Sequence, residues 1–126
     1  MFRGEGIVNA DKTVTVDEVT FSATNIILAT GSRPFVPPIK GVETANYFTT
    51  DTFFNIAKLP KQLTIIGGGV IAIEMAFALA PMGTKVTVLN HSKDILQTEE
   101  PDARPIIKEK MKQLGIELVL NFKLEE

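Results

Sequence analysis

A short apolar run that ends in three consecutive glycines constrains the fold of this chain more than any other feature. Residues 63–66 read Leu-Thr-Ile-Ile, which is the composition of a buried parallel strand, and Gly67, Gly68 and Gly69 end it. The positions that follow contain few polar residues, which predicts a helix packed against a sheet. A second strand predicted over residues 85–89 stands at the distance that a βαβ unit requires.

The glycine turn has the G-x-G-x-x-G/A spacing of a phosphate-binding turn. Gly67 permits the tight turn, Gly69 lets backbone amides approach a pyrophosphate, and Ala72 keeps the helix close to its strand. The unpaired N–H groups and positive dipole end of the helix would face the phosphate. A turn of small residues can also serve packing alone, but the strands on both sides favour nucleotide binding.

Composition narrows the class of protein. The chain has 126 residues, of which 44% are hydrophobic, and this favours one globular domain. Its 13 basic and 15 acidic residues give no sign of a nucleic-acid surface, and the absence of cysteine excludes disulfides, a thiol nucleophile and Cys-based metal sites within this sequence. Without a signal-peptide core or a bilayer-length apolar run, we expect a cytoplasmic protein with no membrane partner.

The first part of the chain has a β pattern. Residues 7–8, 13–16 and 19–21 alternate between apolar and polar side chains, which predicts a small antiparallel meander. Residues 25–29 are apolar on both faces and predict a strand for the interior of a parallel sheet, although the first 60 residues supply no obvious parallel neighbour. The prolines within residues 34–41 favour an extended connection.

The second part continues the βαβ pattern. A short helix is predicted over residues 49–57, and the helix after the glycine turn should end at Pro81 and Gly83. A further helix is predicted from about residue 101 to Gly115, with the neighbouring charges, Lys108 among them, on its solvated face, and a third strand over residues 116–120. The fold class is therefore α/β, a Rossmann-like parallel βαβαβ sheet preceded by an antiparallel meander.

The end of the second strand bears on the choice of nucleotide. In a dinucleotide fold this residue faces the adenine ribose, and an acidic side chain there binds the 2′-hydroxyl of NAD. Here it is Asn90, which can hydrogen-bond a hydroxyl but carries no charge to repel a 2′-phosphate. His91 and Lys93 follow, either as a source of positive charge for a phosphate or as ordinary exposed loop residues. The pattern favours NADPH slightly over NADH.

Two motifs together make a family resemblance. Residues 29–34 read Ala-Thr-Gly-Ser-Arg-Pro and residues 67–74 read Gly-Gly-Gly-Val-Ile-Ala-Ile-Glu. At this spacing the chain resembles the flavin-dependent pyridine nucleotide–disulfide oxidoreductases, in the branch with dihydrolipoamide dehydrogenase, glutathione reductase and mercuric reductase. The resemblance implies that residues 1–34 are the end of an FAD-binding domain, a meander plus one strand, and that residues 35–126 are an NAD(P)-binding domain incomplete at its C-terminus.

The resemblance also implies roles for individual residues. Thr30 and Gly31 would approach the flavin. Glu74 would lie near the nicotinamide and flavin, although by chemistry alone it is equally a carboxylate favoured by the positive end of a helix. The family's nucleotide-binding motif corresponds here to Gly67, Gly68, Gly69, Val70, Ile71 and Ala72.

Several parts of the family have no counterpart in this sequence: the first and second FAD motifs, the redox-active cysteine pair and the interface domain with its catalytic histidine. We therefore expect the NAD(P)H-binding portion of a reductase, inactive alone, with FAD bound only by the full-length parent. The strand at residues 26–29, without its sheet, would favour a homo-oligomer or strand-exchanged self-association.

Two alternatives stay open. One is a stand-alone, non-catalytic nucleotide-binding or interaction module, which the upstream coding sequence would distinguish from a reductase fragment. The other is a methyltransferase-type Rossmann domain, which is weaker because Ile66 stands before the glycines where such a fold usually has an acidic residue.

Overall fold

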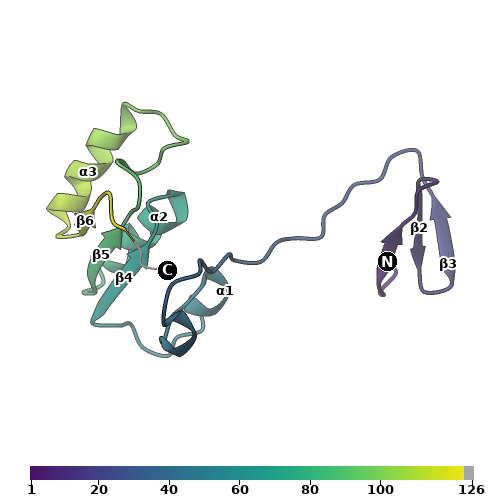
Figure 1. Ribbon diagram of the computed structural model, residues 1–126, viewed down its shortest axis with the longest axis horizontal. Coiled ribbons are helices and arrows are strands. Elements are labelled where there is room, and N and C mark those ends of the chain that lie inside the picture. Colours follow the sequence, from purple (N-terminus) through teal and green to yellow (C-terminus); the bar gives the residue numbers. More distant parts are fainter. Residues whose placement is uncertain (124–126) are drawn as a thin grey trace. The chain divides into compact units, whose positions relative to one another are not determined.

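The computed structural model describes residues 1–123 and divides the chain into two compact units, Met1–Arg33 and Pro34–Glu126 (Figure 1). Figure 1 shows a small β-sheet in the first unit and a sheet with helices in the second. In the described part of the chain, none of the helices is long and apolar enough to cross a membrane.

The first unit is a three-stranded antiparallel meander. Strands β1 (Gly6–Val8), β2 (Thr13–Val16) and β3 (Val19–Ser22) pair in the order β1-β2-β3. The first connection is held by polar side chains: Thr13 donates from its hydroxyl and its N–H to the Asp11 carboxylate, at 2.7 and 3.2 Å, and these bonds lower the pKa of Asp11. The predicted meander is confirmed.

The strand predicted over residues 25–29 is wrong. The segment forms neither helix nor strand, and the side chains of Ile27 and Leu28 are 89% and 69% exposed. An extended segment becomes a strand only when its backbone groups hydrogen-bond to a neighbouring strand. Within residues 1–123, no strand pairs with residues 25–29. Self-association through this segment stays a prediction.

The connection between the two sheets carries two short helical turns, η1 (Val42–Thr44) and α1 (Thr50–Phe53). α1 is shorter than the predicted helix over residues 49–57. Thr49 caps it, accepting from the backbone of Thr52 while its own N–H donates to the Thr52 hydroxyl at 2.9 Å. Phe53 is buried whereas Phe54 is 75% exposed, so only one of the two phenylalanines anchors this turn in the core.

The second unit is a parallel βαβαβ arrangement. Its elements are β4 (Gln62–Ile66), α2 (Val70–Leu79), β5 (Lys85–Leu89), α3 (Ala103–Gln113) and β6 (Glu117–Val119). The strands pair in the order β4-β5-β6, with Val88 of β5 opposite Ile65 on one side and Leu118 on the other. The Rossmann-like α/β fold is confirmed, and β5 is its central strand.

The core gathers around β5. Val86 and Val88 are 1% and 0% exposed. They cluster with buried side chains of α2, of the loop after β5 and of α3, namely Ile73, Ala76, Leu79, Ile95, Leu96 and Met111. Full burial of a valine, leucine, isoleucine or methionine side chain stabilises a fold by about 1.5–3 kcal/mol.

One pair of substitutions in α3 tests this core. Met111 is 1% exposed and Ile106 is 73% exposed on the same helix. Met111→Ala should lower the free energy of unfolding by about 2–5 kcal/mol because it leaves a cavity, whereas Ile106→Ala should change it by less than about 0.5 kcal/mol. Urea denaturation of both variants measures the difference, and equal losses would contradict the placement of α3.

Candidate functional site

The turn between β4 and α2 is tied to the end of β5. Gly67 has a φ of 117°, a left-handed conformation that favours glycine, and its N–H donates to the carbonyl of Leu89 at 2.8 Å. The turn therefore sits at the carboxyl edge of the parallel strands, where ligands bind in open α/β sheets.

The N-terminus of α2 is open to a ligand. Gly69 is the N-cap residue, and its carbonyl accepts the first helical bond from Ile73 at 3.1 Å. No side chain caps this end in the described residues, and the first turn carries no acidic residue. Val70 and Ile71 are 44% and 59% exposed. The first N–H groups of a helix lack intrahelical partners, so this end can accept an anion.

Gly68 packs directly against Asn90. A Cβ on Gly68 would lie 2.7 Å from Asn90 Cγ, closer than real Cβ atoms come to other atoms, so this contact requires glycine. Asn90 is 4% exposed, and its Nδ2 donates to the carbonyl of Asp94 at 2.8 Å. Its side chain thus supports the glycine turn and the loop after β5, while the predicted contact with a ribose stays a prediction.

His91 and Lys93 lie in the loop just after Asn90, and both are exposed. His91 Nε2 lies 3.0 Å from the hydroxyl of Ser92. Both side chains therefore lie on the surface, in the loop that follows β5. A contact between them and a phosphate stays a prediction.

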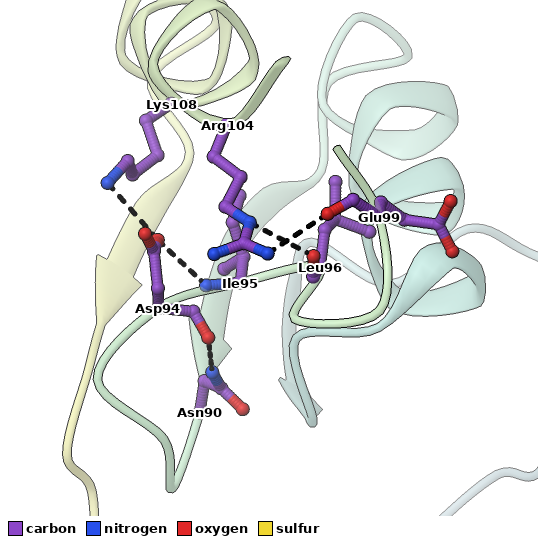
Figure 2. Close-up of polar contacts among 7 residues, drawn as sticks. All are labelled: Asn90, Asp94, Ile95, Leu96, Glu99, Arg104 and Lys108. Atoms are coloured by element: carbon purple, nitrogen blue, oxygen red, sulfur yellow. Dashed lines mark hydrogen bonds and ion pairs between the residues drawn. The ribbon is translucent and has the colours of Figure 1, made fainter. Parts of the chain in front are cut away.

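Two side chains of α3 hold the loop after β5 (Figure 2). Lys108 Nζ lies 3.1 Å from Asp94 Oδ1, which also accepts the N–H of Ile95 at 2.9 Å. The bond from Lys108, together with that from Ile95, lowers the pKa of Asp94. Lys108 was expected on the solvated face of α3, but its side chain is only 36% exposed because it reaches back to this carboxylate.

Arg104 is the other side chain of α3 that holds this loop. Its Nε donates to the carbonyl of Leu96 at 3.1 Å, and its Nη2 donates to the carbonyls of Gln97 and Glu99 at 3.1 and 3.0 Å. Arg104 was not among the predicted site residues. One signal was present: a cation in the first turn of a helix opposes the helix dipole, which indicates that its charge has partners elsewhere.

Leu96 is held in an unfavourable conformation. Its φ is 50°, in the left-handed region, although its side chain is 6% exposed and packs in the core. For a residue with a Cβ this region costs roughly 1–2 kcal/mol. The N–H of Leu96 donates to the carbonyl of Gly68 at 2.8 Å, so the strained residue bonds to the glycine turn.

Glu74 lies beside the first turn of α2. Its exposed side chain helps to line a shallow hollow of about 400 Å³, together with Val70 and Phe77 of α2 and the loop residues Glu99 and Glu100. Three carboxylates line this hollow, and a role for Glu74 beside a nicotinamide stays a prediction.

Thr30 and Gly31 lie in the other unit. Both are exposed and outside the helices and strands, and Gly31 has a φ of 73°. Their predicted approach to a flavin also stays a prediction.

The close fit of Gly68 and Asn90 is testable with two neighbouring glycines. Gly68→Ala should lower the free energy of unfolding by about 1–3 kcal/mol because the new Cβ meets Asn90. Gly69→Ala should leave it near the wild-type value, because no atom lies within 4 Å of that Cβ and its φ of −81° suits any residue.

Urea denaturation of the two variants gives the comparison. Asn90→Ala combined with Gly68→Ala should cost less than the sum of the single changes, because the smaller side chain removes the clash. A Gly68→Ala variant as stable as Gly69→Ala would contradict the contact.

Comparison with known proteins identifies the family. The model of the family described as pyridine nucleotide-disulphide oxidoreductase matches residues 1–126. A dihydrolipoyl dehydrogenase from Geobacillus stearothermophilus is 39% identical over 116 residues, which are 91% of this chain and 23% of that protein. The chain spans 22% to 39% of the length of the first curated relatives that it matches.

Solved structures agree with this match. The HOCl-induced flavoprotein disulfide reductase RclA from Escherichia coli gives a TM-score of 0.79 at 30% identity, covering 97% of this chain and 28% of that one. A water-forming NADH oxidase from Lactobacillus brevis, solved with bound NADH, gives 0.70 at 26% identity, covering 96% and 30%. Since the family model covers all of its length, this chain belongs to the pyridine nucleotide–disulphide oxidoreductase family.

Proposed function

We propose that the second unit binds NADH or NADPH and is the NAD(P)H-binding portion of an FAD-dependent pyridine nucleotide–disulphide oxidoreductase. The observation that carries this proposal is the open N-terminus of α2 at the carboxyl edge of a parallel sheet. It follows directly on a turn in which Gly67 has a left-handed backbone conformation. A pyrophosphate would accept hydrogen bonds from the first N–H groups of α2 and gain from its dipole.

The residues present fit a dinucleotide. Gly69 has open space where a side chain would stand, so a phosphate can approach the backbone. The first turn of α2 carries no carboxylate that would repel the phosphate. The bound nucleotide would supply a hydride, and this chain's residues would hold and orient its pyrophosphate and ribose.

The relatives support the proposal and extend it. The family is FAD- and NAD(P)-dependent, and the L. brevis oxidase was solved with NADH. We extend this to the parent of the present chain, in which Thr30 and Gly31 would lie near the flavin and Glu74 near the nicotinamide. Because hydride transfer needs both cofactors held against each other, residues 1–126 alone should show no reductase activity.

NADPH is the nucleotide that we favour. Asn90 is uncharged, and the exposed His91 and Lys93 follow it directly. A 2′-phosphate near these residues would gain charge-assisted hydrogen bonds that a 2′-hydroxyl cannot match.

Calorimetric titration of the purified chain with NADPH and NADH tests the proposal. Both should bind, NADPH more tightly, and Gly69→Ala should weaken both because its Cβ crowds the phosphate. Lys93→Ala should weaken NADPH binding by about three- to tenfold and leave NADH binding unchanged.

The control for Lys93→Ala is Lys85→Ala. Lys85 is an exposed residue at the opposite end of β5, so its loss should change neither the NADPH nor the NADH affinity. Absence of binding by the unmodified chain would contradict the proposed nucleotide site. Tighter binding of NADH would overturn the roles given to His91 and Lys93.

A further inference from the structure

A chain of hydrogen bonds runs from α3 to the glycine turn. Arg104 donates to the carbonyl of Leu96 at 3.1 Å, and Leu96 donates its own N–H to the carbonyl of Gly68 at 2.8 Å. Both backbone groups of Leu96 are thereby occupied: its N–H donates to the turn, and its carbonyl accepts from Arg104 and also from the N–H of Glu99 at 3.0 Å. Figure 2 shows the guanidinium of Arg104 directed at the carbonyls of this loop.

Leu96 needs this support. Its left-handed φ of 50° is unfavourable for a residue with a Cβ, so the loop would relax if nothing held the peptide groups on either side. Arg104 binds the carbonyl of Leu96 and, further along the loop, the carbonyls of Gln97 and Glu99 through the planar fork of its guanidinium.

A second anchor holds the other part of the loop. Lys108 pairs with Asp94, whose carbonyl accepts from the buried Asn90 amide. Since this part of the loop has its own support, loss of Arg104 should release the segment around Leu96 and leave the contact of Asn90 with Gly68 in place.

We propose that Arg104 is a positioning residue for nucleotide binding, acting through Leu96 on the carbonyl of Gly68. The proposal rests on the proposed function, because it assumes that the glycine turn receives the pyrophosphate. Arg104 would not touch the nucleotide. It would fix the orientation of the Gly68 peptide and so of the amides that face the phosphate.

The test uses three variants of the full chain: Arg104→Ala, Arg104→Lys and, as a control, Lys110→Ala. Lys110 is an exposed residue of the same helix whose loss changes the net charge equally. Arg104→Lys keeps the charge and most of the stem, so it should fold, but a single ammonium group cannot reproduce the fork.

The first readout is amide hydrogen exchange, which needs no nucleotide. Both Arg104 variants should accelerate amide exchange at Leu96 and leave exchange at Val88 of the central strand β5 unchanged, and Lys110→Ala should change neither rate. Unchanged exchange at Leu96 would overturn the proposal, and so would equal acceleration at Val88, which would mean general destabilisation.

The second readout is calorimetric affinity. Both Arg104 variants should bind NADPH and NADH about tenfold more weakly and by the same factor, because the pyrophosphate is common to the two nucleotides. Full rescue by Arg104→Lys, or a change in the ratio of the two affinities, would overturn the proposal.

If the unmodified chain binds neither nucleotide, the proposed function fails and the nucleotide role of Arg104 fails with it. The exchange at Leu96 would still show whether Arg104 holds the turn, so the two failures are distinguishable.

Discussion

The contact of Gly68 with the buried side chain of Asn90 is the constraint on which the site depends. It places the turn after β4 directly on the end of β5, with no room for a Cβ between them. The bond from Gly67 to Leu89 and the bond from Leu96 to Gly68 join the same two regions. The end of β5 and the loop after it therefore hold the glycine turn in place without a ligand. This lowers the entropic cost of ordering the turn on binding.

This arrangement makes the loop after β5 part of the site. A polar loop of this kind would ordinarily be mobile, because few buried contacts hold such segments. Here Ile95 and Leu96 are buried in the core, and Arg104 and Lys108 of α3 bind the backbone and the carboxylate of the loop. The helix that covers the sheet thus also orders the segment that would face a nucleotide.

Local sequence patterns were sufficient to predict much of the fold. The meander, the three parallel strands and the helix after the glycine turn follow from side-chain periodicity and from glycine and proline positions, which act over a few residues. Residues 25–29 were wrongly predicted as a strand because strand formation depends on a partner, which periodicity does not report.

The site was predictable only in part. Gly67 and Gly69 are identified by their spacing, since the turn geometry needs them. The burial of Asn90 depends on how the glycine turn packs against the end of β5. The reach of Arg104 and Lys108 to the loop depends on how α3 packs beside β6. No local pattern encodes either. The expected contact of Asn90 with a ribose stays a prediction, and no local pattern indicates that its amide donates to the carbonyl of Asp94.

An NMR titration of the amide-labelled chain with NADH and NADPH tests most directly whether a nucleotide binds at the N-terminus of α2. We expect the amide resonances of Gly69, Val70 and Ile71 to shift most, with smaller shifts in the loop after Asn90 and none in the strand Thr13–Val16 of the meander. Shifts confined to other regions would contradict a nucleotide site at the N-terminus of α2, because they would place the ligand elsewhere.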